Sequence, residues 1–182
     1  TILPAAGRGY GFEALLRKNR GKLQGWASYT YANADQRSPG ITPADPGIND
    51  GQWYAAPYDR TQDITFTGIY PLSDSWTLGA NFVYASGLPT TYPASRYEFG
   101  GVILSEFGPR NAERLPAYHR LDLSFTKKFT KNELQFGIFN VYNRFNAQAL
   151  SFRQSQDTPF VTEAAQFSVF GIVPSISYRF FF

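Results

Sequence analysis

The stretch YHRLDLSFTKKF, residues Tyr118–Phe129, alternates between polar and apolar side chains. Leu121, Leu123 and Phe125 share one parity, while the other parity carries charged and hydroxyl side chains: Arg120, Asp122, Ser124, Thr126 and Lys128. A period of two places these sets on opposite faces of a β-strand, whereas a helix would need an apolar repeat of three to four. The stretch therefore predicts a strand with one apolar face and one polar face.

Working outward in both directions, similar Tyr-, Phe-, Thr-, Val- and Ile-rich stretches recur. We predict an all-β, antiparallel fold of about seven strands: Arg8–Lys18, Lys22–Asn33, Arg60–Leu72, Trp76–Ser86, Tyr118–Phe129, Glu133–Asn143 and Gln166–Phe182. The parity of Trp26 matches that of Gln24 and Ser28, so Trp26 is expected on the polar face.

The connections between these strands alternate in length. Three are short turns, at residues 19–21, 73–75 and 130–132, and three are long and polar, at residues 34–59, 87–117 and 144–165. Within the second long connection, Gly100–Phe107 is either a strand extension or a small loop hairpin. Bacterial outer-membrane barrels are wired with short periplasmic turns and long outer loops, so this pattern predicts a transmembrane β-barrel segment.

The placement of aromatic residues favours the same interpretation. Tyr and Trp cluster near strand ends, where the interfacial girdle of a barrel lies: Tyr31, Tyr70, Trp76, Tyr84, Tyr142 and Tyr178. Alternate apolar residues also run to the end of the chain, at Ile176, Tyr178, Phe180 and Phe182. We expect these four to form a terminal strand of the kind that barrel-assembly machinery recognises. Strand by strand, a half-buried soluble sheet explains the alternation too.

Composition narrows the remaining classes. Of 182 residues, 18% are aromatic, Cys and Met are absent, and the net charge is +3. Without Cys there is no disulfide framework or thiolate metal site, and no block of Lys and Arg marks a nucleic-acid partner. No apolar run is long enough for a transmembrane helix, and any signal peptide is expected upstream of Thr1. We expect no cofactor.

Strand parity bears on where the barrel begins. If the last strand ends in the periplasm, the first begins at the outer face, yet single-chain bacterial barrels have an even number of strands and both termini in the periplasm. We therefore expect residues 1–182 to be the C-terminal part of a larger barrel whose earlier strands lie upstream of Thr1.

Several motifs, taken in order, resemble those of TonB-dependent receptors. The stretch GYGFEALL at residues 9–16 resembles their G-x-E-L-x-L strand, and GKLQGWASYTY at 21–31 resembles the following W-x-S-Y-T strand. Further likenesses follow at YDR (58–60), NFVYASGLP (81–89), LPAYHRLDLS (115–124) and FNVYNRFN (139–146). Each motif alone is weakly specific, but their order is strongly specific.

The resemblance implies a 22-stranded barrel with an N-terminal plug, and a peptide that engages TonB. It implies energy-coupled uptake of a nutrient such as a siderophore, an oligosaccharide or a peptide, at the bacterial outer membrane. The style is similar to the SusC-like, carboxypeptidase-regulatory-domain branch. Implied partners are outer-membrane lipid and lipopolysaccharide, the rest of the barrel and its plug, TonB, and a surface lipoprotein lid.

Two sets of residues are candidates for the barrel interior and the ligand. Charged residues expected to face inward and pair across strands are Arg60, Asp63, Arg120, Asp122 and Arg179. Candidate ligand contacts in the loops are Trp53, Tyr54 and Tyr92, because aromatic rings stack on flat ligands at little entropic cost; packing within the loops explains them equally.

Two other functions remain open at this level. A soluble all-β carbohydrate-binding module would share the alternating strands. An outer-membrane enzyme barrel would need a catalytic set, but His119 is the one histidine and no nucleophile motif accompanies it, so we expect no catalytic role.

Overall fold

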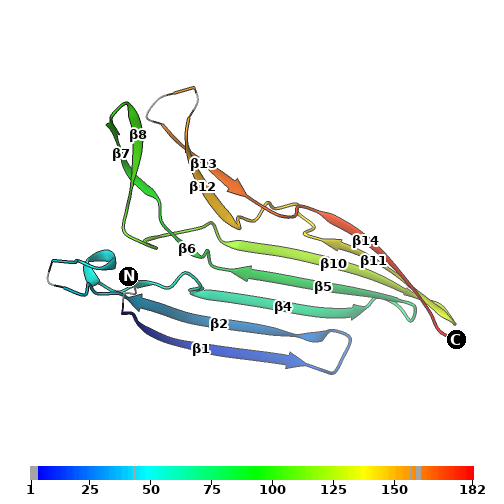
Figure 1. The fold of residues 1–182 in the computed structure, drawn as a ribbon. Coiled ribbons are helices and arrows are strands. Elements are labelled where there is room, and N and C mark those ends of the chain that lie inside the picture. The colour runs from blue at the N-terminus through cyan, green and yellow to red at the C-terminus, as the bar shows by residue number, and fades with distance from the viewer. Residues whose placement is uncertain (1–3, 43, 156, 159–160) are drawn as a thin grey trace.

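The computed structural model describes residues 4–42, 44–155, 157–158 and 161–182. Its main feature is a curved antiparallel sheet in which each long strand lies beside the next one along the chain (Figure 1). The long strands, in sheet order, are β1 (Ala6–Lys18), β2 (Gln24–Arg37), β4 (Gln62–Pro71), β5 (Trp76–Ala85), β10 (Tyr118–Lys128), β11 (Asn132–Phe139) and β14 (Val173–Phe180).

The long strands confirm the predicted all-β fold, but three boundaries were wrong by four residues or more. The strand predicted to end at Asn33 continues to Arg37, because its pairing with β1 extends to Ala6. The last strand begins at Val173 rather than Gln166, because Gln166 and Phe167 pair instead within a loop hairpin. The strand predicted to reach Asn143 ends at Phe139, since Asn140 and Asn143 adopt left-handed backbone conformations (φ 55° and 53°) that end a strand.

Two of the predicted long loops contain hairpins of their own. Strands β7 (Pro93–Phe99) and β8 (Val102–Phe107) form one. Of the two alternatives predicted for Gly100–Phe107, the loop hairpin is therefore the correct one. Its tip is Gly100-Gly101, both at positive φ, as tight hairpin turns require. Strands β12 (Ala149–Gln154) and β13 (Thr162–Phe167) form the other, which the sequence did not predict. Three two-residue strands complete the described strands: β3 (Tyr54–Ala55), β6 (Pro89–Thr90) and β9 (Glu113–Arg114).

All the short turns lie at one end of the main sheet and all the long connections at the other (Figure 1). We call these the turn end and the loop end. The hairpins β7–β8 and β12–β13 rise from the loop end, while the C-terminus lies at the turn end. The one helical turn among the described residues, Ile48–Gly51, is far too short to cross a bilayer.

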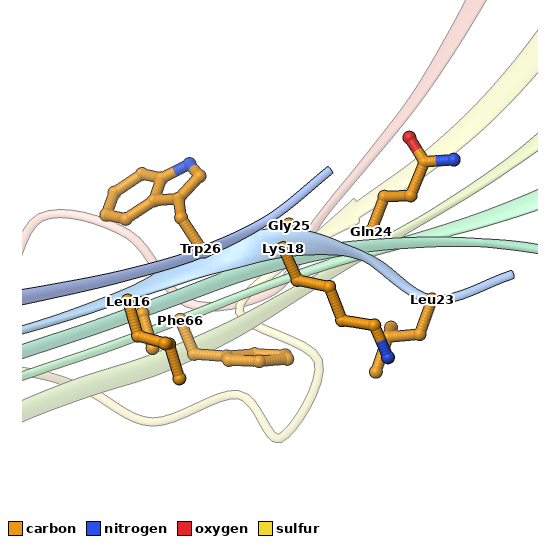
Figure 2. Close-up of a pocket in the computed structure, with 8 residues that line it drawn as sticks. Leu16, Lys18, Leu23, Gln24, Gly25, Trp26 and Phe66 are labelled. Carbon is orange, nitrogen blue, oxygen red and sulfur yellow. The ribbon is translucent and has the colours of Figure 1, made fainter. Parts of the chain in front are cut away.

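The strand register divides the sheet into two faces. Cross-strand partners share a face, so the pairs Ala27↔Phe66, Phe66↔Phe82 and Phe82↔Leu121 form a continuous row on what we call the apolar face. The pairs Thr67↔Asn81 and Asn81↔Asp122 form a row on the polar face. Figure 2 shows the division at the turn end: Leu16 and Phe66 point to one side of the sheet and Trp26 to the other. Trp26 thus lies on the polar face, as its parity predicts.

The sheet is a single layer with almost no core. Among the described residues, the buried apolar side chains are Tyr54, Ala56, Ala85 and Leu115, all near the loop end. Large side chains of the apolar face are open: Leu16 is 74% exposed and Ile176 is 69% exposed. Burying such side chains is worth about 1.5–3 kcal/mol each. A stable sheet of this kind therefore needs an apolar medium or partner over that face.

Candidate functional site: the polar face and the base of the loops

A hydrogen-bonded chain crosses the polar face at mid-sheet. The Thr67 hydroxyl donates to Asn81 Oδ1 (2.8 Å), and the Asn81 amide donates to Asp122 Oδ2 (3.3 Å). Register places these three residues side by side on β4, β5 and β10, which is why short polar side chains reach one another. This row of hydrogen bonds satisfies the polar groups of Thr67 and Asn81 and ends at the Asp122 carboxylate.

Asp122 is the junction of this network. Its carboxylate forms an ion pair with Arg120 (Nε–Oδ1, 2.9 Å) and accepts a hydrogen bond from the Asn140 backbone N–H (2.9 Å). Arg120 also donates to the Tyr118 hydroxyl (2.7 Å) and lies over the Phe139 ring, 4.1 Å from its centroid. The predicted pair thus forms along one strand rather than between neighbours, because residues two apart share a face.

Asn140 links this network to the turn after β11. It is fully buried, and its side chain both donates to the Arg144 carbonyl (2.8 Å) and accepts from the Arg144 N–H (3.1 Å). Asn tolerates the left-handed backbone that such a turn needs. A cavity of about 410 Å³ lies beside it on the polar side, with Tyr118, Arg120 and Phe170 among its walls.

A second charged contact fixes the base of the loops. Asp59 is 1% exposed and forms an ion pair with Arg114, while accepting a hydrogen bond from the Ala34 backbone N–H (2.6 Å). Arg114 also donates to the Gly87 carbonyl (3.0 Å). Ala34 lies within β2, Asp59 in the connection before β4, and Gly87 and Arg114 in the connection between β5 and β10, so one buried carboxylate holds these three segments together. We call this contact the Asp59–Arg114 clamp.

Asparagine side chains tie two of the loops to each other. Asn49 exchanges two hydrogen bonds with the Arg110 backbone, donating to its carbonyl (2.9 Å) and accepting from its N–H (2.7 Å). Asn111 donates to the Ala55 carbonyl (2.8 Å). A hollow of about 460 Å³ lies between these segments, lined by residues 49–50, 52–55 and 109–112. Trp53 and Tyr54, two of the predicted ligand contacts, are part of its wall.

The three candidate aromatic contacts differ in how accessible they are. Trp53 is 36% exposed, with the Arg8 guanidinium 4.4 Å from its ring centroid. Tyr54 is buried at 7% exposure, which limits what its ring offers a ligand. Tyr92 is not part of the wall of the loop hollow: its ring meets Phe152 edge-on at 5.2 Å, and its hydroxyl donates to the Arg114 carbonyl (3.3 Å). The structure therefore brings together Trp53 and Tyr54 but not Tyr92.

The other predicted inward charges lie at different heights. Asp63 is on the polar face of β4, and Arg60 lies exposed just before that strand; within the part of the chain that the structure describes, neither forms an ion pair. Arg179 lies at the turn end, 3.6 Å from the Glu133 carboxylate on the neighbouring strand β11. The charges do not converge on one point, so they line a surface rather than form a single centre.

The C-terminal candidates share the apolar face. Ile176 pairs with Phe136, Tyr178 with Leu134, and Phe180 with Asn132. Phe182 follows with the same parity, its ring 5.2 Å from that of Phe180. β14 is an edge strand of the main sheet.

His119 lies on the apolar face near the loop end, as the partner of Tyr84 in the register. Its ring nitrogen Nδ1 is 2.9 Å from the Tyr142 hydroxyl, and its backbone exchanges two hydrogen bonds with the Asn146 side chain (3.0 and 2.9 Å). These contacts give it a structural role in the wall. No grouping of His, Cys, Asp and Glu that could hold a metal ion occurs among the described residues.

In the hairpin β12–β13, neighbouring groups shift the pKa of the Glu163 carboxyl, and this shift affects the stability of the hairpin. A hydrogen bond with Ser155, and then the neighbouring Arg153 guanidinium, lower the pKa of Glu163 from its ordinary value. The Arg153 Nε donates to Glu163 Oε2 at 3.0 Å across the two strands.

An antiparallel sheet with one apolar face, one hydrogen-bonded polar face and every long connection at one end has the construction of a membrane β-barrel wall. Comparison of the sequence with known families gives the same class of protein. The family model described as TonB dependent receptor-like, beta-barrel matches residues 1–141, and the chain belongs to that family. No curated protein and no solved structure matches the chain. Family membership favours the membrane barrel over the soluble module that the sequence left open.

Two functional features were missed by sequence reasoning. The Asp59–Arg114 clamp joins residues 55 positions apart, which no local pattern encodes. The parallel between YDR at 58–60 and YHRLD at 118–122 was a usable signal, because Asp59 and Asp122 each accept a backbone N–H from the chain beside them. The Asn140 turn also had a signal, since Asn at the end of an apolar strand favours a left-handed residue.

Proposed function

We propose that the chain forms part of the wall and three outer loops of an outer-membrane receptor for energy-coupled nutrient uptake. The observation that carries the proposal is the single-layer sheet, whose apolar face is open while its polar face is cross-linked by hydrogen bonds. Lipid would cover the first face, and a water-filled lumen with a plug would adjoin the second. The family match supports the class of protein.

The proposal extends to the whole barrel. Residues 1–182 supply its C-terminal strands, further strands and a plug precede them, and TonB engages a segment outside this chain. The loop hollow beside Trp53 is a candidate contact for a siderophore, an oligosaccharide or a peptide. A SusC-like assignment with a lipoprotein lid over the loops is part of the same proposal. Lipopolysaccharide would surround the loop end.

Residues 1–182 contain no Cys, so cysteines introduced into them test the topology when their labelling is compared with that of the unsubstituted parent. Single substitutions Gly101→Cys, at the tip of β7–β8, and Asp74→Cys, in the β4–β5 turn, are made in the intact protein and probed with a membrane-impermeant maleimide. At neither glycine of the β7–β8 tip would a Cβ meet another atom within 4 Å, so the tip accepts a side chain without contact, although its positive φ strains the turn. The loop-end cysteine should react on intact cells and the turn-end cysteine only after the outer membrane is opened. Equal labelling of both in intact cells would contradict the proposal.

The transport step is tested in cells that produce the protein. Uptake of labelled ferric siderophores, oligosaccharides and peptides is compared in cells with and without the gene, and with and without an uncoupler of the proton-motive force. One ligand class should enter only with the gene and only in energised cells. If no class depends on both, the receptor function is excluded even where the topology holds.

A further inference from the structure

The charges of this chain are distributed unequally between the two ends of the sheet. The turn end, taken as residues 17–23, 71–76, 127–133 and 179–182, contains eight cationic side chains and two acidic ones. The cations are Arg17, Lys18, Arg20, Lys22, Lys127, Lys128, Lys131 and Arg179, and the acids are Asp74 and Glu133. Every lysine of the chain is in this group, and the turn end has a net charge of +6 within an overall +3. The remainder, which includes the loop end, is therefore net negative.

A shallow apolar groove lies within this cationic end. Its lining residues include Leu16, Leu23 and Phe66, with a volume of about 160 Å³. The groove exists because Gly25 and Gly68 are cross-strand partners, so two neighbouring strands carry no side chain at this height of the apolar face. A Cβ on Gly25 would come within 2.1 Å of the Thr67 carbonyl oxygen, so the gap is enforced by the close approach of the strands.

Lys18 shares the apolar face with this groove and lines it. Figure 2 shows its side chain on the same side of the sheet as Leu16 and Phe66, extending toward Leu23. Lysine can lie along apolar surface with its methylenes while its ammonium reaches the polar boundary. The groove thus offers an apolar surface for an acyl chain and, beside it, a positive charge for a phosphate, and the two together complement a phospholipid.

A second lysine on the apolar face has an aromatic neighbour. Lys127 is the cross-strand partner of Trp76, with its Nζ 5.0 Å from the ring centroid and 2.8 Å from Ser75 Oγ. Trp76 is the one tryptophan on the apolar face of the described sheet, since Trp26 lies on the polar face and Trp53 in a loop. It therefore reports on whatever covers this face at the turn end.

We propose that the turn end is a binding surface for anionic phospholipids of the periplasmic leaflet, with acyl chains against the Gly25–Gly68 groove and phosphates near Lys18 and Lys127. The inference rests on the proposed membrane placement and adds a lipid preference to it. Charge complementarity selects this occupant: basic residues at a membrane surface attract anionic lipid, each strengthening binding by about fivefold. A zwitterionic lipid meets the same groove without that gain.

The test uses brominated lipids, which quench tryptophan on contact. The intact protein is reconstituted in phosphatidylcholine vesicles containing equal fractions of brominated phosphatidylglycerol or brominated phosphatidylcholine, and the quenching lost in Trp76→Phe is assigned to Trp76. We expect the phosphatidylglycerol probe to be preferred at this site by about fivefold to 25-fold at low ionic strength, for one or both lysines engaged, and the preference to fall as salt screens the charges. The double variant Lys18→Gln, Lys127→Gln should remove most of the preference.

The controls separate this inference from the membrane placement. Arg96→Gln with Arg153→Gln removes two cations from the loop end and should leave the preference intact. Quenching by brominated phosphatidylcholine verifies in each variant that the apolar face has inserted. Equal quenching of Trp76 by both probes overturns the anionic-lipid site and leaves the membrane placement standing. The same result is expected if the cationic turn end binds an acidic protein instead of a lipid. Failure of either probe to quench Trp76 overturns the membrane placement as well.

Discussion

Replacing Asp59 by Ala should destabilise the sheet more than any other single carboxylate change at the loop end. The carboxylate is 1% exposed, receives the Ala34 N–H at 2.6 Å and is paired with Arg114. Removing one partner of a buried ion pair costs about 3–5 kcal/mol, because the other charge is left uncompensated. The Arg114 side chain is 35% exposed and keeps its bond to Gly87, so water offsets part of that cost. We expect the unfolding free energy to fall by about 3 kcal/mol.

The partner change should be the more damaging of the two. Arg114→Gln leaves a carboxylate buried to 1% exposure with no cation beside it, and we expect a loss of about 4 kcal/mol. The double variant removes both charges, so it should lose less than the sum of the single variants by about 2–3 kcal/mol. Asp74→Ala, at an exposed turn position, is the matched control and should lie within about 0.5 kcal/mol of the parent.

The measurement is urea-dependent folding of the intact protein in detergent micelles, followed by tryptophan fluorescence and by migration on unheated gels. The free energies of the parent, the two single variants and the double variant form a double-mutant cycle. If the single losses add to the double loss within about 0.5 kcal/mol, the two side chains are not coupled, and the role given to the clamp is wrong.

Three further predictions follow from local geometry. Gly25→Ala places a Cβ 2.1 Å from a carbonyl oxygen of β4 and should cost about 1–3 kcal/mol in the same urea assay, whereas Gly7→Ala, whose nearest contact is 3.8 Å, should be neutral. The pKa of Glu163 is lowered in the folded hairpin, so its interactions stabilise β12–β13 at neutral pH, and this stabilisation is lost as the pH falls through the lowered pKa. Amide exchange in β13 should therefore become faster in acid relative to exchange in β8. Equal protection of β13 at neutral and acid pH would contradict this. Phe182→Ala should reduce the fraction of protein assembled in the outer membrane more than Phe181→Ala, which has the opposite parity; an equal effect on heat-modifiable migration would exclude recognition of alternate residues.

The wall of this protein could be predicted from sequence because its code is local. Alternation along Tyr118–Phe129 defines the face of each side chain, and the turn at 130–132 joins that strand to the next. The register observed between β10 and β11 keeps Phe125 opposite Phe136, so apolar residues of neighbouring strands meet on one face. The placement of Trp26 followed from the same rule.

The loop end could not be predicted in the same way. Its contacts are made by side chains that reach backbone groups far along the chain, such as Asn49 with Arg110 and Arg114 with Gly87. Neither partner of such a contact belongs to a periodic pattern, and each contact forms only because a second loop folds back to the same place. The hairpin β12–β13 was missed because its strands are short and its residues alternate weakly. Of the candidate aromatic contacts, Trp53 and Tyr54 consequently line the loop hollow, whereas Tyr92 does not.

The neighbour-to-neighbour order of the main sheet has a consequence for the route by which the protein folds. Each long strand pairs with the next long strand along the chain, and three of those pairs, β1–β2, β4–β5 and β10–β11, are closed by short turns. Bringing nearby segments together sacrifices little chain entropy, so hairpins of this kind form early. Growth can then proceed stepwise, each hairpin offering its free amide and carbonyl row as a template for the one beside it. The slowest junctions should be those spanned by the longest connections, β5 to β10 and β11 to β14, and time-resolved exchange labelling would detect the delay as late protection of the amides between the strands of these two pairs.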